Sequence, residues 1–307
     1  MSVAWLDWST PVAIWWVFLL LVSAVNVAAL LRLRARFRGS RGDKPAAKSA
    51  AIWLEPLFLL CAVYVLGCAF RSVLPRADVQ RICLFDTWLS SVMLGRSVAT
   101  IAELCFAAQW AIVLYALGKV ANSDTAKNIA KAIVPTIVLA EISSWYAVIS
   151  TNFLGNVLEN SLWTITFLLI GIALSRLVPR FRGPAQFAIA AAAAGIAAYV
   201  VFMATVDVPM YFGRWQADLL SAKDYLGLIA GLHDVATRWI VTHDIAPWRD
   251  EIAWMSLYFS MAVWSSLALA GFGLAKRLLP RYRVRAPLSR ATRRPVAVAV
   301  QSPARGR

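Results

Sequence analysis

Long apolar stretches separated by short polar connections make up most of the chain. A helix needs about 20 mostly apolar residues to cross the hydrocarbon core of a bilayer. Seven stretches meet this condition: Pro11–Leu31, Ala51–Phe70, Ser97–Leu117, Ala132–Thr151, Val157–Leu174, Ala185–Thr205 and Ile252–Ala275. We therefore expect an all-α polytopic transmembrane helix bundle, with residues 1–275 as a single domain.

The composition also indicates a lipid environment. Hydrophobic residue types make up 60% of the 307 residues and charged types 15%, whereas an average soluble domain is about 25% charged. These values exclude a soluble globular domain and a disordered chain.

The distribution of Lys and Arg predicts how the chain crosses the membrane. Of 31 such residues, 23 fall in three connections and the C-terminal tail on one side, and 8 fall on the other side. Cytoplasmic loops are the ones enriched in Lys and Arg. We therefore expect the N-terminus outside and the C-terminus in the cytoplasm. The Ala- and Arg-rich composition favours a bacterial cytoplasmic (inner) membrane.

Two segments lie outside the predicted spans and are long enough to have roles of their own. Residues 206–251 form a long extracytoplasmic connection with helical spacing of leucines, which predicts helices on the membrane interface. Residues 276–307 form a basic tail without apolar periodicity, which predicts disorder and contact with anionic lipid headgroups. The net charge of +15 thus reflects membrane orientation, and no nucleic-acid partner is expected.

Acidic residues inside the predicted spans are the first candidates for chemistry. An acid at the bilayer centre costs about 2.5–3.5 kcal/mol on insertion scales, so it needs a partner or a water-filled cavity. Glu55 lies near the cytoplasmic start of its span and can reach the interface, whereas Glu103 and Glu141 lie deeper. We therefore take Glu103 and Glu141 as candidate catalytic acid/base residues.

Polar residues accompany these two glutamates in the outer halves of three successive spans. Arg96, Thr100 and Glu103 are spaced i, i+4 and i+7, so they share one helix face. Residues of the fourth and fifth spans at similar depth are Ser144, Asn152, Glu159 and Asn160. This arrangement predicts a polar pocket that opens to the extracytoplasmic side. Interhelical hydrogen bonds, worth about 0.6–2 kcal/mol each, are the alternative role of such residues.

Three arginines precede the third span on the acid-rich side of the membrane. Arg71, Arg76 and Arg81 run against the positive-inside tendency, so a local partner is expected to hold them. Together with Arg96 they are candidates for binding a headgroup, phosphate or carboxylate, because guanidinium offers a planar donor fork. Pairing with nearby acids such as Asp78 or Glu159 is the alternative.

Cysteines and histidines give weaker signals. Cys68 and Cys83 both fall on the predicted outer side and are candidates for a disulfide. His233 and His243 are ten residues apart, which is not a helical metal-binding spacing, and no metal site is assigned. The last span contains no Lys that could carry a retinal Schiff base, and no P-loop, nucleophile elbow or zinc-protease motif is present. The sequence thus identifies no cofactor.

These observations leave three classes of function open. In the first, the pocket binds or acts on a lipid-linked or amphipathic anionic substrate, with Glu103 or Glu141 as acid/base and the arginines holding the anion. In the second, the protein is a proton-coupled transporter whose titrating site is Glu141. In the third, it is a non-catalytic scaffold that holds a membrane protein partner in a complex.

Overall fold

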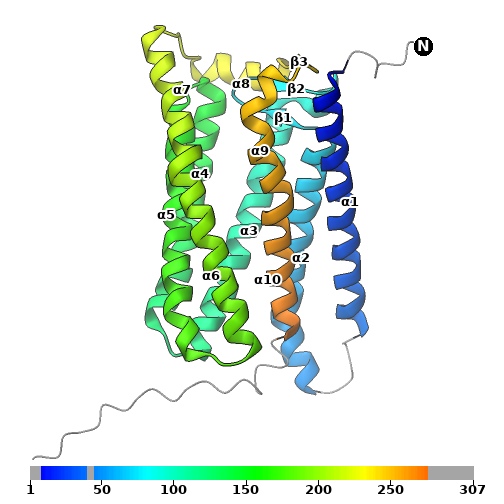
Figure 1. The fold of residues 1–307 in the computed structure, drawn as a ribbon, viewed down its shortest axis with the longest axis vertical. Coiled ribbons are helices and arrows are strands. Elements are labelled where there is room, and N and C mark those ends of the chain that lie inside the picture. Colours follow the sequence, from blue (N-terminus) through cyan, green and yellow to red (C-terminus); the bar gives the residue numbers. More distant parts are fainter. Residues whose placement is uncertain (1–7, 40–44, 276–307) are drawn as a thin grey trace, which may run out of the picture.

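Long helices that run side by side form the protein (Figure 1). The structure, a computed structural model, describes residues 8–39 and 45–275. Within these ranges, seven helices are long and apolar enough to cross a membrane, which confirms the predicted all-α, multi-pass membrane bundle. The basic tail, residues 276–307, lies outside the described residues, and its contact with lipid headgroups stays a prediction.

The first six long helices follow the predicted spans but extend beyond them at their polar ends. Their bounds are α1 Thr10–Gly39, α2 Pro45–Val73, α3 Val92–Val120, α4 Asp124–Ser150, α5 Leu154–Leu177 and α6 Pro184–Phe202. Serine caps explain two of the early starts, because the Ser91 side chain accepts from Leu94 N and the Ser123 side chain accepts from Ala126 N. As a result Arg96 lies inside α3, on the helix face that its spacing from Thr100 and Glu103 predicted.

Two spans are interrupted by π-helical turns. The turn Met203–Asp207 joins α6 to α7 (Val208–Leu220), and the turn Tyr258–Ala262 joins α9 (Arg249–Leu257) to α10 (Val263–Ala275). In the first case a proline begins the next helix. A proline within a helix clashes with the carbonyl four residues earlier, and the wider turn relieves that clash.

The predicted outer connection 206–251 is partly wrong. Residues 208–220 do not lie on the interface but continue the sixth span, because the π turn lets the helix pass the proline. Only α8 (Leu228–Thr237) lies across the end of the bundle (Figure 1). Its Leu228 and Ile229 side chains are exposed, as expected for a helix at the membrane interface.

A small sheet closes the same end of the bundle. The strands are β1 Arg76–Ala77, β2 Ile82–Cys83 and β3 Ile240–Val241, with β1 and β2 antiparallel and β2 and β3 parallel. Strands of two residues have no periodic pattern, so the sequence did not predict them. We call the end that carries this sheet and α8 the capped end.

Helix α3 occupies the centre of the bundle and positions the candidate residues. It packs between α2 and α4, while α5 packs on α4, α6 on α5, and α10 on α2. Stacked aromatic rings fill the middle, with Phe106 of α3 4.7 Å from Tyr64 and 6.2 Å from Phe167 between ring centroids. At the end opposite the cap, the last turn of α3 carries Lys119, the first turns of α4 carry Lys127, and the α5–α6 connection carries Arg180 and Arg182. This separation of charge fits the predicted orientation, which stays a prediction.

Candidate functional site

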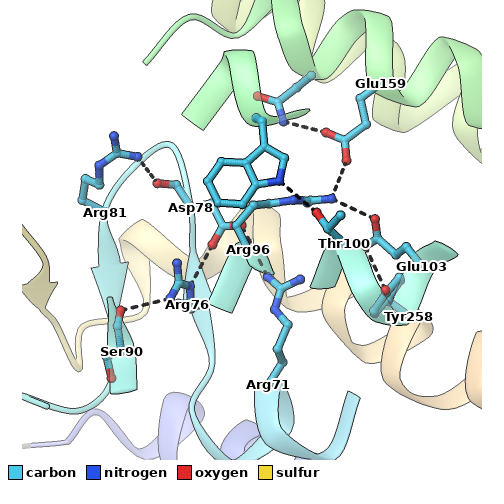
Figure 2. A network of polar contacts seen from close by, with 12 residues as sticks. Arg71, Arg76, Asp78, Arg81, Ser90, Arg96, Thr100, Glu103, Glu159 and Tyr258 are labelled. Carbon is cyan, nitrogen blue, oxygen red and sulfur yellow. Dashed lines mark hydrogen bonds and ion pairs between the residues drawn. The ribbon is translucent and has the colours of Figure 1, made fainter. Parts of the chain in front are cut away.

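One arginine is shared by three buried glutamates. Arg96 Nη2 lies 2.9 Å from Glu103 Oε2, 2.6 Å from Glu141 Oε2 and 3.4 Å from Glu159 Oε1. Each of these side chains is less than a tenth exposed, and carboxylate oxygens of the three glutamates lie within 4.8 Å of one another. We call Arg96 and these three residues the glutamate cluster; Figure 2 shows part of it.

Three helices bring the cluster together. Arg96 and Glu103 are two turns apart on α3, Glu141 faces them from α4, and Glu159 comes from the first turns of α5. The sequence predicted the shared face on α3 and the similar depth of the other two glutamates. The structure shows that all four point to the same place.

Each glutamate has a different second partner. Glu141 Oε2 accepts from Thr100 Oγ1 at 2.7 Å, and Thr100 in turn accepts from Trp145 Nε1 at 3.1 Å. Tyr258 Oη donates to Glu103 Oε1 at 2.9 Å. The third carboxylate, Glu159, receives Asn156 Nδ2 at 3.2 Å.

The hydrogens on Arg96 Nη2 are too few for the three carboxylates. Arg96 Nη2 carries two hydrogens but faces oxygens of three carboxylates. Glu141 Oε1 has no hydrogen-bond partner among the described residues. Three ionised carboxylates would therefore leave net negative charge in a buried space, which is costly unless a cation or a proton neutralises it.

A metal ion could in principle use the three carboxylates, because their oxygens are close enough to bind one cation. Arg96 Nη2, however, lies 2.6–3.4 Å from an oxygen of each, which is the position that the ion would take. The guanidinium already supplies positive charge there. The geometry therefore fits proton binding better than metal binding.

Two further arginines share one aspartate beside the glutamate cluster. Arg76 Nε donates to Asp78 Oδ1 at 2.8 Å, and Arg71 Nη2 lies 3.8 Å from Asp78 Oδ2. Arg76 Nη1 also donates to the carbonyl of Ser90 (Figure 2) and to that of Ser91. Burial alone would raise the pKa of Asp78, but the charges of Arg76 and Arg71 outweigh it and hold that pKa at about 2.

Arg81 belongs to the cap rather than to the pocket. Its Nε donates to Asp234 Oδ2 at 2.7 Å, and its terminal nitrogens donate to the carbonyls of Asp78 and Val148, both at 2.6 Å. These bonds tie the loop before α3 to α4 and α8. The candidate role of Arg81 in anion binding thus has no support in its contacts.

A cavity of about 60 Å³ lies between the two clusters. Its lining includes three guanidinium-bearing residues, Arg71, Arg76 and Arg96, together with Asp78, Glu159 and Glu251. A water molecule has about 30 Å³ in the liquid, and drug-sized ligand pockets measure about 300–1,000 Å³. The wide funnel expected from the sequence is therefore a small cavity in this structure.

The remaining candidates divide into two groups. Ser144 and Asn160 are buried and line the cavity. Asn152, by contrast, caps the start of α5, because its Oδ1 accepts from Leu154 N and its Nδ2 lies 3.3 Å from Tyr146 Oη. Asn152 thus has a structural role that the sequence did not separate from the pocket.

The predicted disulfide between Cys68 and Cys83 is not formed, since both residues are free thiols. Cys68 is buried in α2, whereas the Cys83 sulfur lies 3.4 Å from the Phe85 carbonyl and 3.8 Å from the Ile240 carbonyl within the sheet. Burial raises the pKa of the Cys83 thiol, which disfavours the reactive thiolate. The spacing predicted the same side of the membrane for both residues but could not predict the direction of their side chains.

The two histidines occupy different parts of the cap. His243 stacks on Trp8 at 4.4 Å between ring centroids, and its Nε2 lies 2.8 Å from the Leu84 carbonyl oxygen. His233 lies on α8, where its backbone carbonyl accepts from Thr237. Both sets of contacts are structural.

The sequence missed three residues of the site. Tyr258, which contacts Glu103, is the first residue of one π turn, and the buried Asp207 is the last residue of the other. Glu251 is buried at the edge of the cavity and contacts Arg214 and Gln80. The predicted spans ended before Asp207 and began after Glu251, so both acids were placed in the outer loop.

Comparisons with known protein families, with curated proteins and with solved structures find no match to this chain. A functional proposal therefore rests on the residues of the site. They form one cluster of three glutamates around Arg96 and one arginine-rich cluster around Asp78, with a small cavity between them.

Asp78→Asn is expected to destabilise the protein by about 3–5 kcal/mol at neutral pH, because it leaves two buried arginines without their carboxylate. Since the folded-state pKa of Asp78 is depressed to about 2, its stabilisation is complete above the unfolded pKa of about 3.9 and is lost as the pH falls toward 2. Thermal unfolding of both proteins from pH 7 to pH 2 measures this. The control is Asp124→Asn, whose side chain is 85% exposed at the other end of the bundle. A difference between wild type and Asp78→Asn that does not shrink below pH 4 would contradict the prediction.

Proposed function

We propose that this protein is a proton-coupled carrier of the bacterial cytoplasmic membrane, and that its glutamate cluster takes up and releases the proton. The observation that supports this proposal is the sharing of one guanidinium nitrogen by three buried carboxylates. Ionisable residues inside membrane bundles commonly form proton relays. The capped end faces the exterior in this proposal.

Repulsion between the carboxylates explains why the cluster would bind a proton. Their oxygens lie within 4.8 Å of one another, and like charges interact strongly at such distances away from water. One carboxylate pair can share a proton when both cannot ionise, as in other carboxylate dyads. Uptake and loss of that proton would change the net charge of the cluster by one.

The surroundings assign different roles to the three glutamates. Glu141 Oε2 receives the two shortest hydrogen bonds of the cluster, 2.6 Å from Arg96 and 2.7 Å from Thr100, so Glu141 is the glutamate best stabilised as an anion. Glu103 and Glu159 share the remaining donors and are the better candidates for the exchanged proton. This changes the sequence hypothesis, in which Glu141 alone was the titrating site.

The π turns support a carrier because they place flexible points beside the cluster. Tyr258 begins one turn and donates to Glu103, and Asp207 ends the other turn on the opposite side of the bundle. π turns within α-helices occur frequently at functional sites. In a carrier, movement of α7 and α9 about these turns would change access to the proton site.

An enzyme that acts on a lipid-linked or amphipathic anionic substrate is the second candidate. Unequal surroundings of neighbouring carboxylates, as found for Glu103 and Glu141, are typical of an acid/base pair. The cavity of about 60 Å³ is too small for such a substrate in this conformation. A scaffold would make the cluster dispensable, which the following experiment detects.

Infrared difference spectroscopy of the protein in lipid tests the proton site. A pH step is expected to give a carbonyl band of a protonated carboxyl group, and Glu103→Gln or Glu159→Gln is expected to remove or shift it. In vesicles loaded with a pH dye, proton uptake driven by a membrane potential should fall about 10²-fold in the same variants, the contribution typical of acid/base groups. Asp124→Asn is the control. No titrating band at any pH, or uptake unaffected by both variants, would refute the proposal.

A further inference from the structure

The donors around the cavity are less well satisfied than its charged acceptors. Arg71 Nε, Arg76 Nη2 and Arg96 Nε are buried and have no hydrogen-bond partner among the described residues. All three arginines are at most 6% exposed and line the cavity. Buried N–H groups in native proteins are nearly always paired, so three free ones on one cavity indicate a ligand that accepts hydrogen bonds.

The acids that line the cavity are already paired with other residues. Asp78 holds Arg71 and Arg76, and Glu159 contacts Arg96 and Asn156. Glu251, the third acid, receives Arg214 Nη1 at 3.1 Å and Gln80 Nε2 at 2.8 Å. The cavity is thus bordered by spare guanidinium hydrogens and by carboxylates that face other donors.

We infer that this cavity is an oxyanion subsite, and that Arg71, Arg76 and Arg96 bind the carboxylate or phosphate group of the species that the carrier moves together with a proton. This inference rests on the proposed carrier function and adds the class of substrate. A planar guanidinium matches the oxygens of either group. The volume of about 60 Å³ admits the oxyanion group and little else.

Arg96 connects the subsite to the proton site. Its Nη2 contacts the three glutamates and its Nε is free beside the cavity. An anion at Nε adds negative charge close to the cluster, and this favours protonation of a glutamate. By linkage, protonation favours anion binding to the same degree. One side chain thus couples the two binding events.

A salt bridge between α7 and α9 marks the access route. Arg214 on α7 contacts Asp250 at 3.0 Å and Glu251 at 3.1 Å, both in the first turn of α9. Tyr211 of α7 and Trp254 of α9 both line the cavity. Separation of these helices would open the subsite, either to solvent at the capped end or to the outer leaflet. The oxyanion can therefore belong to a free solute or to a lipid headgroup.

The test measures thermal unfolding of the whole protein in phosphatidylcholine nanodiscs with added inorganic phosphate, acetate or chloride. Phosphate or acetate is expected to raise the unfolding temperature more than chloride at equal ionic strength. Arg71→Gln should weaken the affinity for the anion, obtained from the dependence of the unfolding temperature on anion concentration, by roughly tenfold or more. This corresponds to the loss of one charge-assisted hydrogen bond. Arg71 is chosen because Asp78 keeps Arg76 as a partner at 2.8 Å, so the fold is retained. Arg71→Lys is a second variant that retains the charge, and Arg176→Gln, exposed at the other end, is the matched control.

The outcomes distinguish a free anion from a lipid headgroup, and they distinguish failure of the oxyanion subsite from failure of the proposed carrier function. Protection by phosphate or acetate that Arg71→Gln abolishes supports a free anion, and protection that appears only when phosphatidylglycerol is added supports a headgroup. No protection by any anion or lipid, or equal protection in wild type and Arg71→Gln, overturns the inference. Protection equal to that of chloride also overturns it. In these cases a titrating carboxyl band in the infrared spectrum would still support the proton site. Specific anion binding without such a band would instead refute the carrier function and leave the oxyanion subsite supported.

Discussion

Arg96→Gln is expected to be the most disruptive single substitution in the membrane-spanning part of the protein. It removes the guanidinium that contacts Glu103, Glu141 and Glu159. Loss of one partner of a buried ion pair costs about 3–5 kcal/mol, and here three carboxylates lose it together. Total stabilities of native domains are about 5–15 kcal/mol, so the variant should be poorly folded at neutral pH. Its yield and unfolding temperature in detergent measure the effect.

A second substitution should restore part of this loss. Glu103→Gln removes one of the negative charges that Arg96→Gln leaves unpaired, while Tyr258 can still donate to the amide oxygen. A double-mutant cycle is expected to give a favourable coupling of about 0.5–3 kcal/mol. The control pairs Arg96→Gln with Asp124→Asn at the far end of α4, for which additivity is expected. If Arg96→Gln and the double variant have equal unfolding temperatures, the three carboxylates are not held by Arg96.

The spans could be predicted because each depends on a local property, namely about 20 apolar residues in a row. The ends of the spans could not, because they depend on features that weigh little in a hydropathy average. Ser91 moves the start of α3 outward, and the π turn before α7 extends the sixth span to Leu220. Both changes bring polar residues that had been assigned to loops into the bundle.

In the candidate site too, local features could be predicted from the sequence and contacts between distant segments could not. The spacing of Arg96, Thr100 and Glu103 within one helix was sufficient to place them on a common face. Contacts between helices could be predicted only in part. The similar depth of Glu141 and Glu159 in their spans indicated that they lie near Glu103, but nothing in the sequence indicated Tyr258. The small sheet could not be predicted from the sequence, because β2 and β3 are each two residues long and more than 150 residues apart.

The cap depends on one arginine that the sequence had assigned to ligand binding. Arg81 is 1% exposed and donates to Asp234 of α8, to the Asp78 carbonyl and to the Val148 carbonyl at the end of α4. Its backbone carbonyl accepts from Ile240 N of β3 at 2.7 Å. Its φ of 61° lies in the left-handed region, which is costly for a residue with a side chain and persists only where other contacts fix it. These contacts join three separate parts of the chain at a single side chain.

Arg81→Met is therefore expected to release α8 and the sheet while leaving the membrane-spanning helices intact. The variant leaves Asp234 and two carbonyls without their buried donor, at a cost of about 3–5 kcal/mol. Hydrogen exchange should increase across residues 76–91 and 228–241 and stay low in the centre of α3. Arg238→Met is the matched control, because Arg238 pairs with the same Asp234 but its side chain is 53% exposed, and exposed pairs contribute about 0–1 kcal/mol. Equal exchange in the two variants would show that burial of Arg81 does not hold the cap. Since β1 and residues 78–80 of the following loop line the cavity beside Glu159, release of the sheet should also admit solvent to the glutamate cluster.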